Sequence, residues 1–343
     1  MPLTVPPCVC NLRILATSDL HAHVVPHDYY TDRSAEGVGL AHTARLIEIL
    51  RGSATNSILL DNGDFLQGSA MGDYAAEAGV NPHPIIAAMN YLDYDVVALG
   101  NHELNYGLPF LRQALAAAQF PVVSANLMTA DGQATLFARE ALLDRVLRDQ
   151  DGRDWPIRIG VIGFLPPQVV AWDRLHLADK ATATGIVEAA RGLVPVLRAA
   201  GADVVIALCH SGIGDGSDDP DSEDAGLALA RVPGIDAMIT GHTHQVFPGP
   251  DFADQPLADC VKGQLAGIPA CMPGSAGSHV GVIDLALRRT AGGWQVESGT
   301  ARAAPVTEAS YLPPCPGILR LMDVHHRGTR AHLSRTVGLI ERP

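Results

Sequence analysis

The sequence predicts an α/β fold built on largely parallel strands, and three observations carry this prediction. Short apolar runs recur along the chain, patterns of helical spacing lie between them, and most runs lead directly into polar blocks of metal-binding residue types. Apolar runs without alternation indicate strands that are covered on both faces. Strands that alternate with helices indicate right-handed crossovers between parallel strands.

The predicted strands and helices follow one another along most of the chain. The predicted strands are residues 12–17, 57–60, 96–99, 157–164, 204–208 and 237–240. The predicted helices are residues 39–51, 84–92, 109–118 and 185–200. Gly52 ends the first of these helices, as glycine commonly does.

The pattern changes after about Pro269. Residues 279–288 alternate between apolar and polar side chains, residues 294–304 form a second such run, and residues 290–293 are typical of a turn. We expect an antiparallel hairpin here, followed by a final helix over residues 317–333.

Composition narrows the range of partners. The 343 residues are 47% hydrophobic and 18% charged, which is enough for one large domain or two small ones. A net charge of −13 argues against binding of a nucleic-acid polymer through its phosphates. A small phosphorylated substrate would then need a local positive centre, which bound metal ions can supply.

Membrane and secretion signals are not found in the sequence. No apolar run is long enough to span a bilayer, so we expect no membrane partner. Residues 1–10 lack the basic and apolar segments of a signal peptide, which leaves a cytoplasmic protein or one whose leader is absent from this chain.

The six cysteines do not settle the compartment. Cys8 and Cys10 are too close for an easy mutual bridge, and Cys209 ends an apolar run, which favours a buried free thiol. The remaining cysteines are dispersed and form no Cys-x-x-Cys pair, so a zinc knuckle is not expected.

Five polar blocks follow the predicted strands. They are Asp19-Leu20-His21, Gly63-Asp64, Gly100-Asn101-His102-Glu103, His210 and Gly241-His242-Thr243-His244. Sheets of this class hold their sites at the carboxyl ends of strands, so the blocks are expected to meet. Carboxylate, imidazole and amide ligands without thiolate are typical of a two-metal centre that activates water.

Individual blocks allow simpler interpretations. Asp19 and His21 alone are best explained as a polar turn, and a lone His210 after a buried strand is more often a core residue. In context, Asp64 can bridge two cations, while His242 and His244 form a chelating pair that His210 can complete.

The remaining polar residues are given less specific roles. His102 is expected to donate a proton to the leaving oxygen, and Glu103 to support the turn or orient a neighbour rather than bind metal. The other histidines are interpreted as surface or packing residues. The acidic stretch 215–224 is interpreted as a solvated loop, because it lacks the EF-hand spacing.

The ordered blocks resemble the calcineurin-like metallophosphoesterase superfamily. Further segments are similar to the branch that hydrolyses 2′,3′-cyclic nucleotides and 3′-nucleotides, and the likeness runs from about Leu12 to the C-terminus. These segments are residues 28–30, 60–69, 100–107, 241–249 and 251–254. The resemblance implies a four-layer αββα sandwich with metals between the two sheets.

The resemblance also implies a ligand set and a catalytic group. One metal would be held by Asp19, His21, Asp64 and His244, and the other by Asp64, Asn101, His210 and His242. His102 would be the catalytic histidine, with Asn101 beside it meeting charge on the phosphoryl group. The expected cofactors are two divalent transition metal ions, namely Mn, Zn, Fe or Co.

The chain departs from the related 5′-nucleotidases in one residue and in extent. Asn105 stands where they have an aspartate that orients the histidine, and an amide can fix a tautomer but supplies no charge. Family members usually carry a C-terminal domain that stacks the nucleobase. We expect residues 1–11 to be an extension, 12–335 the catalytic domain, and 336–343 the start of a connector to that nucleotide-binding domain.

The expected function is hydrolysis of phosphate esters by a 2′,3′-cyclic-nucleotide 2′-phosphodiesterase with 3′-nucleotidase activity, periplasmic by resemblance. The nearer alternative is a 5′-nucleotidase or UDP-sugar hydrolase on the same fold, which Asn105 and the segment Tyr29-Tyr30 disfavour. The farther alternative is a binding module without catalysis, which the complete ligand set disfavours.

Overall fold

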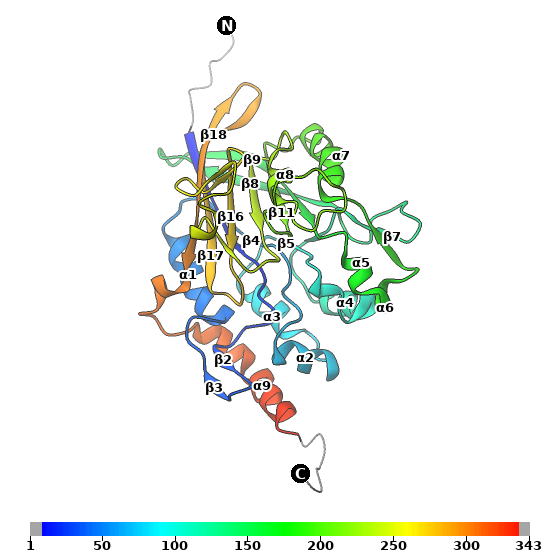
Figure 1. Ribbon diagram of the computed structural model, residues 1–343. Helices are drawn as coiled ribbons and strands as arrows, with labels where there is room; N and C mark the ends of the chain where they lie inside the picture. Colours follow the sequence, from blue (N-terminus) through cyan, green and yellow to red (C-terminus); the bar gives the residue numbers. More distant parts are fainter. Residues whose placement is uncertain (1–8, 336–343) are drawn as a thin grey trace.

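The computed structural model describes residues 9–335, in which two sheets pack face to face and helices cover both outer surfaces (Figure 1). This is the predicted α/β class, and the layers follow the order helix, sheet, sheet, helix. The proposed connector 336–343 and Cys8 lie outside the described residues.

The first sheet has the strand order β18-β17-β1-β4-β5-β6. Its members are β1 (Val9–Thr17), β4 (Ser57–Asp61), β5 (Val96–Ala98), β6 (Val122–Val123), β17 (His279–Thr290) and β18 (Gly293–Pro305). β1, β4, β5 and β6 are parallel to one another, while at the other edge β17 is antiparallel to β1 and β18 is antiparallel to β17. The predicted C-terminal hairpin is therefore confirmed, and it extends the first sheet.

The second sheet has the strand order β14-β15-β16-β12-β11-β9-β8, and β13 pairs with β16. Its main strands are β8 (Glu140–Arg148), β9 (Asp154–Phe164), β11 (Val204–Cys209), β12 (Ala237–Thr240) and β16 (Ile268–Pro273). Its short strands are β13 (Val246–Phe247), β14 (Ala258–Asp259) and β15 (Gln264–Leu265). β9, β11, β12 and β16 are parallel, which places the carboxyl ends of β9, β11 and β12 on one side.

Helices form the two outer layers. Those packed on the first sheet are α1 (Leu40–Gly52), α2 (Ala70–Glu77), α3 (Pro84–Tyr91), α4 (Gly107–Leu115) and α9 (Pro316–Leu333). Those on the second sheet are α7 (Ile186–Ala199) and α8 (Gly226–Ala230). The smaller elements are α5 (Val169–Trp172), α6 (Arg174–Leu177), β2 (His27–Asp28), β3 (Arg33–Ser34), β7 (Leu127–Thr129), β10 (Ala181–Ala183), η1 (His102–Leu104), η2 (Pro250–Phe252) and η3 (Val306–Ala309).

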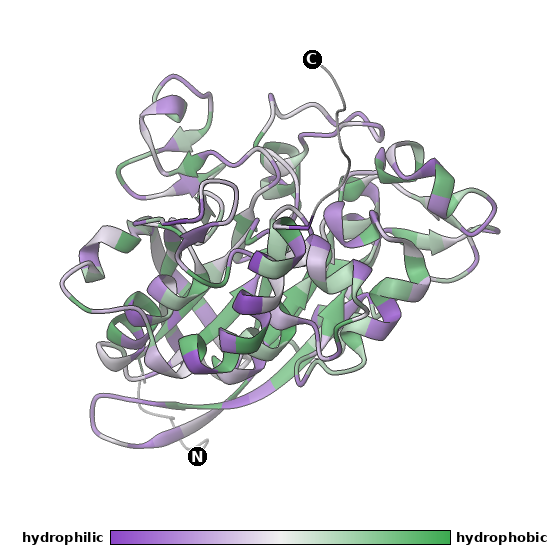
Figure 2. Ribbon diagram, turned by 90° about the horizontal axis from the view of Figure 1, so that it is seen from below, coloured by the Kyte–Doolittle hydropathy of each residue, from purple (hydrophilic) through white to green (hydrophobic). Residues whose placement is uncertain are grey.

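Side-chain alternation along each strand decides which layer a residue joins. In β1, Leu12 and Ile14 point into the core between the sheets, whereas Leu15 points toward the helices. In β11, Ile206 lies between the sheets and Val205 lies under α7 and α8. Both faces of these strands are apolar, which explains their nearly continuous apolar runs. The interior strands are accordingly mainly green in Figure 2, while purple residues are frequent on loops and outer helices.

Every strand and helix predicted from the sequence is present, with ends shifted by a few residues, and several further elements were not predicted. Residues 9–11, assigned to an N-terminal extension, belong to β1 and pair with β17. β8 was not predicted, although Ala141, Leu143 and Leu147 face the inter-sheet core in alternation, because it is an edge strand with a charged outer face. β16, α2, α8 and the shorter elements were also missed.

Two further predictions from the sequence can be compared with the structure. Cys209 is a buried free thiol, as expected, and burial raises its pKa to about 12. Among the helices of residues 9–335, none combines the length and the apolar character needed to cross a bilayer.

The inter-sheet core predicts a large stability cost for truncating Ile206, which is fully buried in β11. We expect Ile206→Ala to lower the free energy of unfolding by about 2–5 kcal/mol, because it removes buried methyl groups and leaves a cavity. Denaturant titration measures this loss. Val196→Ala, on the half-exposed face of α7, is the matched control and should change stability by less than about 0.5 kcal/mol. Equal effects of the two substitutions would contradict the assigned core.

Candidate metal centre

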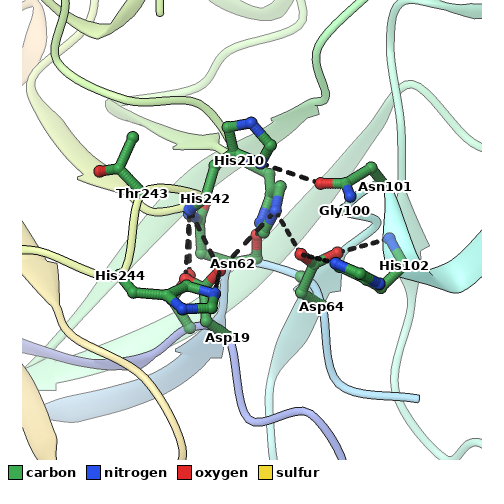
Figure 3. A network of polar contacts seen from close by, with 12 residues as sticks. Asp19, Asn62, Asp64, Gly100, Asn101, His102, His210, His242, Thr243 and His244 are labelled. Carbon is green, nitrogen blue, oxygen red and sulfur yellow. Dashed lines mark hydrogen bonds and ion pairs between the residues drawn. The ribbon is translucent and has the colours of Figure 1, made fainter. Parts of the chain in front are cut away.

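The candidate site lies where the carboxyl ends of strands from both sheets meet, and most of the labelled side chains, though not Thr243, point toward one another (Figure 3). Asp19, Asp64 and Asn101 follow β1, β4 and β5 of the first sheet. His210 and His242 follow β11 and β12 of the second sheet. Neither sheet supplies the complete set, so the site exists only when the sheets are packed together.

The backbone turns sharply at the proposed ligands. Asp19, His21, Asp64, His242 and His244 have φ values of 54°, 48°, 57°, 70° and 59°. The left-handed region costs an L-residue roughly 1–2 kcal/mol, because Cβ approaches the following carbonyl oxygen. Residues held in this region concentrate at functional sites, where surrounding packing imposes them. The packed strand ends therefore aim these side chains inward at a cost in local stability.

Glu103 ties the loops after β4 and β5 together. Its buried carboxylate accepts hydrogen bonds from the backbone N–H groups of Asp64, Phe65, Leu66 and Gly100 at 2.7–3.0 Å. Burial and the nearby Asp64 raise the pKa of Glu103. Glu103 thus contacts the backbone that carries the candidate ligands, and it lies behind the metal-binding atoms.

One group of ligand atoms comes from Asp19, His21 and His244, which lie within 4.8 Å of one another. Nδ1 of His21 lies 2.8 Å from the carbonyl oxygen of Gln67, so this nitrogen carries the proton and donates it. Nε2 of His21 then presents a lone pair, and it faces Nε2 of His244 at 2.9 Å. Burial lowers the pKa of His21 to about 4, which favours the neutral imidazole that a metal requires.

A second group consists of Asp64, His210 and His242, again with ligand atoms within 4.8 Å of one another. Nδ1 of His210 donates to the carbonyl oxygen of Asn62 at 2.9 Å, which turns Nε2 toward the carboxylate of Asp64, also at 2.9 Å. That buried Nε2 makes no hydrogen bond with the described residues. His210 is thus held with its free nitrogen toward a carboxylate.

His242 is fixed from both sides. Its Nε2 lies 2.8 Å from a carboxylate oxygen of Glu223, and its Nδ1 lies 2.9 Å from the amide oxygen of Asn101. Trp172 also stacks on the ring, with centroids 5.7 Å apart and planes at 15°. If Nε2–H donates to Glu223, then Nδ1 of neutral His242 presents a lone pair to the oxygen of Asn101.

The residues fit a pair of cations. Potential ligand atoms lie 2.9 Å apart between His21 and His244, between His210 and Asp64, and between His242 and Asn101. Two lone pairs at such a distance repel, so a proton or a cation must lie between the two atoms of each pair. Burial raises the pKa of Asp19 to about 7, and the carboxylates of Asp64 and Asp19 raise the pKa of His210 to about 10 although burial alone lowers it. Both shifts favour the protonated forms of Asp19 and His210, and a proton offsets the buried negative charge as a cation would.

Asp64 connects the groups. It belongs to the group with His210 and His242 and also to a third group with His21 and His102. Although burial opposes the shift, the facing His210 holds the pKa of Asp64 below its usual range. A buried, ionised carboxylate with ligands on both sides is suited to bridging two cations.

His102 lies at the edge of this cluster, and its side chain is about one-third exposed, at 36%. Its Nε2 lies 4.0 Å from a carboxylate oxygen of Asp64. Its Nδ1 lies 2.6 Å from the amide oxygen of Asn105 and 2.8 Å from that of Gln67. Both partners accept, so Nδ1 carries the proton and Nε2 is directed at the site.

The sequence analysis missed several residues of the site. The acidic stretch is a largely exposed loop, as expected, but its exposed Glu223 contacts His242, and the sequence analysis did not anticipate this contact. Gln67, Trp172 and Asp173 were also not singled out. Gln67 lies within the conspicuous segment 60–69, whereas the positions of the others depend on loops and carry no local signal.

The chain was compared with known proteins. Residues 12–246 match the model of the calcineurin-like phosphoesterases. The chain is 44% identical over 335 residues to the 2′,3′-cyclic-nucleotide 2′-phosphodiesterase/3′-nucleotidase of Yersinia enterocolitica, covering 96% of this chain and 51% of that protein. It is 32% identical over 241 residues to a 5′-nucleotidase of Diplobatis ommata, covering 68% of this chain and 37% of that one. The chain spans about half the length of the curated cyclic-nucleotide phosphodiesterases that it matches.

Solved structures agree in fold. The crystal structure of calcineurin-like phosphoesterase YfkN from Bacillus subtilis superposes with a TM-score of 0.92 at 37% identity, covering 95% of this chain and all of that chain, at 100%. A four-layer αββα sandwich, predicted from the resemblance, is thereby confirmed. By sequence and by structure, the chain belongs to the calcineurin-like phosphoesterase family.

Proposed function

We propose that this chain is a two-metal hydrolase of phosphate esters that opens 2′,3′-cyclic nucleotides and then hydrolyses the resulting 3′-nucleotides. The observation that carries the proposal is that potential metal ligands lie on both sides of Asp64, with the buried Nε2 of His210 held toward its carboxylate. Relatives whose names state these two activities match 96% of the chain at 43–44% identity.

Two sets of side chains would hold the metals. Asp19, His21, Asp64 and His244 would hold one ion, and Asp64, Asn101, His210 and His242 the other. Two divalent transition ions supply Lewis acidity toward phosphoryl oxygens and lower the pKa of a bound water. Mixed carboxylate, imidazole and amide donors suit Mn, Zn, Fe or Co.

His102 is placed to supply the proton that the leaving group needs. In the first reaction water adds to phosphorus and the bond to the ribose 2′-oxygen breaks. In the second reaction the bond to the 3′-oxygen breaks. Each leaving group is a ribose alkoxide, which is a poor leaving group until it is protonated. Nε2 of His102 is the partly exposed nitrogen beside Asp64 from which this proton would come.

Base recognition is proposed to reside largely in a C-terminal domain of the longer relatives. Stacking of a base on an aromatic side chain contributes about 1–3 kcal/mol. Within the described residues, aromatic rings near the site include Trp172, which is 47% exposed and packs on His242. A single ring of this kind discriminates weakly between bases, because every base has a π-face.

Substrate comparison tests the proposal. We expect this chain, with Mn added, to turn over 2′,3′-cyclic AMP and 3′-AMP faster than 5′-AMP, with similar kcat/KM for 2′,3′-cyclic AMP and 2′,3′-cyclic UMP. A simple aryl phosphodiester should be hydrolysed readily. Preference for 5′-AMP would favour the 5′-nucleotidase alternative, and metal binding without turnover would favour a binding module. Strong discrimination between adenine and uracil would place base recognition inside this chain.

Substitution of Asp64 tests the shared ligand. We expect Asp64→Asn to lose at least one of two bound metals and most activity, because an amide offers one oxygen without charge where two cations need a carboxylate. Elemental analysis of the purified variant measures the metal content. Asp254→Asn, on an exposed loop, is the control and should retain both ions. Two metals and normal turnover in Asp64→Asn would refute the bridging role.

Substitution of His102 tests the proton donor. We expect His102→Ala to keep its metals and lose about 10²–10⁴-fold in kcat on 3′-AMP, as is typical for a missing general acid. The loss should be much smaller on a nitrophenyl ester, whose leaving group needs no proton. Steady-state kinetics on both substrates provide the comparison. Equal losses would assign His102 to electrostatic stabilisation instead.

A further inference from the structure

A chain of polar contacts continues behind His102. Nδ1 of His102 donates to the amide oxygen of Asn105 at 2.6 Å. The Nδ2 group of Asn105 in turn donates to both carboxylate oxygens of Asp173, at 3.1 and 3.2 Å. Asp173 is 9% exposed and lies between α5 and α6, a segment remote in sequence from the loop after β5.

The chemistry of Asp173 decides which way the amide of Asn105 points. An amide has a donor end and an acceptor end of almost the same shape, so packing alone distinguishes them poorly. An ionised carboxylate only accepts hydrogen bonds, which forces the NH₂ end of Asn105 toward Asp173. The oxygen of Asn105 is therefore left facing His102, whose Nδ1 must carry the proton. Nε2 is then the nitrogen available to the substrate.

A second chain acts on the same nitrogen. Gln67 also accepts from Nδ1 of His102, at 2.8 Å, and Tyr106 is hydrogen-bonded to Gln67. The hydroxyl of Tyr106 donates to Asp73, so its oxygen is left to accept from the NH₂ group of Gln67. The acceptor end of Gln67 is thereby turned toward His102. Both chains end in a carboxylate, and both leave an amide oxygen facing Nδ1 of His102. They therefore favour the same tautomer of His102, with the proton on Nδ1.

The side chain of Asp173 does not cap the helix that follows it. It precedes α6, where an aspartate side chain commonly caps the first turn by accepting backbone N–H groups. Here its side chain makes no capping hydrogen bond, and its backbone carbonyl accepts from His176 and Leu177 instead. Both carboxylate oxygens are directed at Asn105. The carboxylate of Asp173 therefore hydrogen-bonds to the side-chain amide of Asn105 and not to the helix.

We propose that Asp173 is a positioning residue, which orients the amide of Asn105 so that His102 is held with Nδ1 protonated and Nε2 toward the substrate. This inference rests on the proposed function of the site. It identifies Asp173 as the carboxylate behind His102, since position 105 here carries an amide. Asp173 acts through Asn105 and does not contact the reacting phosphate.

The first test is Asp173→Asn. The new side chain has nearly the same shape, but it can both donate and accept, so it no longer requires the NH₂ group of Asn105 to face it. We expect kcat on 3′-AMP to fall about 10- to 100-fold, the usual scale for a lost outer hydrogen-bond partner, with KM and metal content unchanged. The loss is partial because Gln67 remains as an acceptor. On a nitrophenyl ester the loss should be much smaller. Asp179→Asn, an exposed substitution on the same segment, is the matched control and should behave as the unchanged protein.

The second test exchanges the two side chains. Asn105→Asp alone places two carboxylates against each other at the distance now spanned by a hydrogen bond, and should also lower kcat. In the double variant Asn105→Asp with Asp173→Asn, the carboxylate accepts directly from His102 and the amide behind it donates. We expect this double variant to be more active than either single variant. A double variant no better than the singles would overturn the proposal, since a purely structural Asp173 gives no such rescue.

A readout independent of turnover separates this inference from the proposed function. The ¹⁵N shifts of the His102 ring at alkaline pH report which nitrogen carries the proton. We expect the Nδ1–H form in the unchanged protein and a mixture of forms, or the Nε2–H form, in Asp173→Asn. An unchanged tautomer in Asp173→Asn would refute the positioning role even in an active enzyme. The expected shift in a protein without phosphoesterase activity would uphold the geometry and refute the function.

Discussion

The apolar contact between the two sheets is the constraint on which the site depends. Leu12, Ile14 and Ile206 belong to one core, and the strands that carry them are followed by Asp19 and His210. Three ligand blocks come from the first sheet and two from the second, so a relative shift of the sheets would separate the halves of the site. Burial of each large aliphatic side chain contributes about 1.5–3 kcal/mol, and many such contacts hold this register. Local elements then refine it, above all the Glu103 carboxylate that joins two loops of the first sheet.

Bringing the side chains of the site together is electrostatically unfavourable. Asp19, Asp64 and His210 are almost completely buried, and burying charged groups is unfavourable unless each is paired. The raised pKa values of His210 and Asp19, which favour the protonated form of each, are one solution. Two cations in place of those protons would satisfy the same lone pairs, so metal binding should release protons and stabilise the folded state. The left-handed backbone of the ligand loops adds a further cost that such binding would offset.

The sequence was most informative where a residue's position follows from its strand. Asp19, Asp64, Asn101, His210 and His242 lie directly after apolar runs, and parallel strands bring such positions to a common edge, so their convergence could be expected. Gln67 lay inside a segment already noted for its resemblance. Glu223 and Asp173 could not be found in this way, because each comes from a connection whose path depends on tertiary packing. The edge strand β8 was missed for a related reason, since its charged outer face weakens the apolar signal.

The pairing of β1 with β17 has a consequence for synthesis on the ribosome. Leu15 lies opposite Val282, so one edge of β1 has no partner until β17 has been synthesised. Every candidate ligand has been translated by residue 244, but the first sheet is complete only when the final hairpin emerges. Until then β1 offers a line of unpaired N–H and C=O groups to any neighbouring chain. This edge of a nascent chain is therefore open to misassociation from the time β1 emerges until β17 does, and binding factors that shield the N-terminal strand would act over most of the period of synthesis.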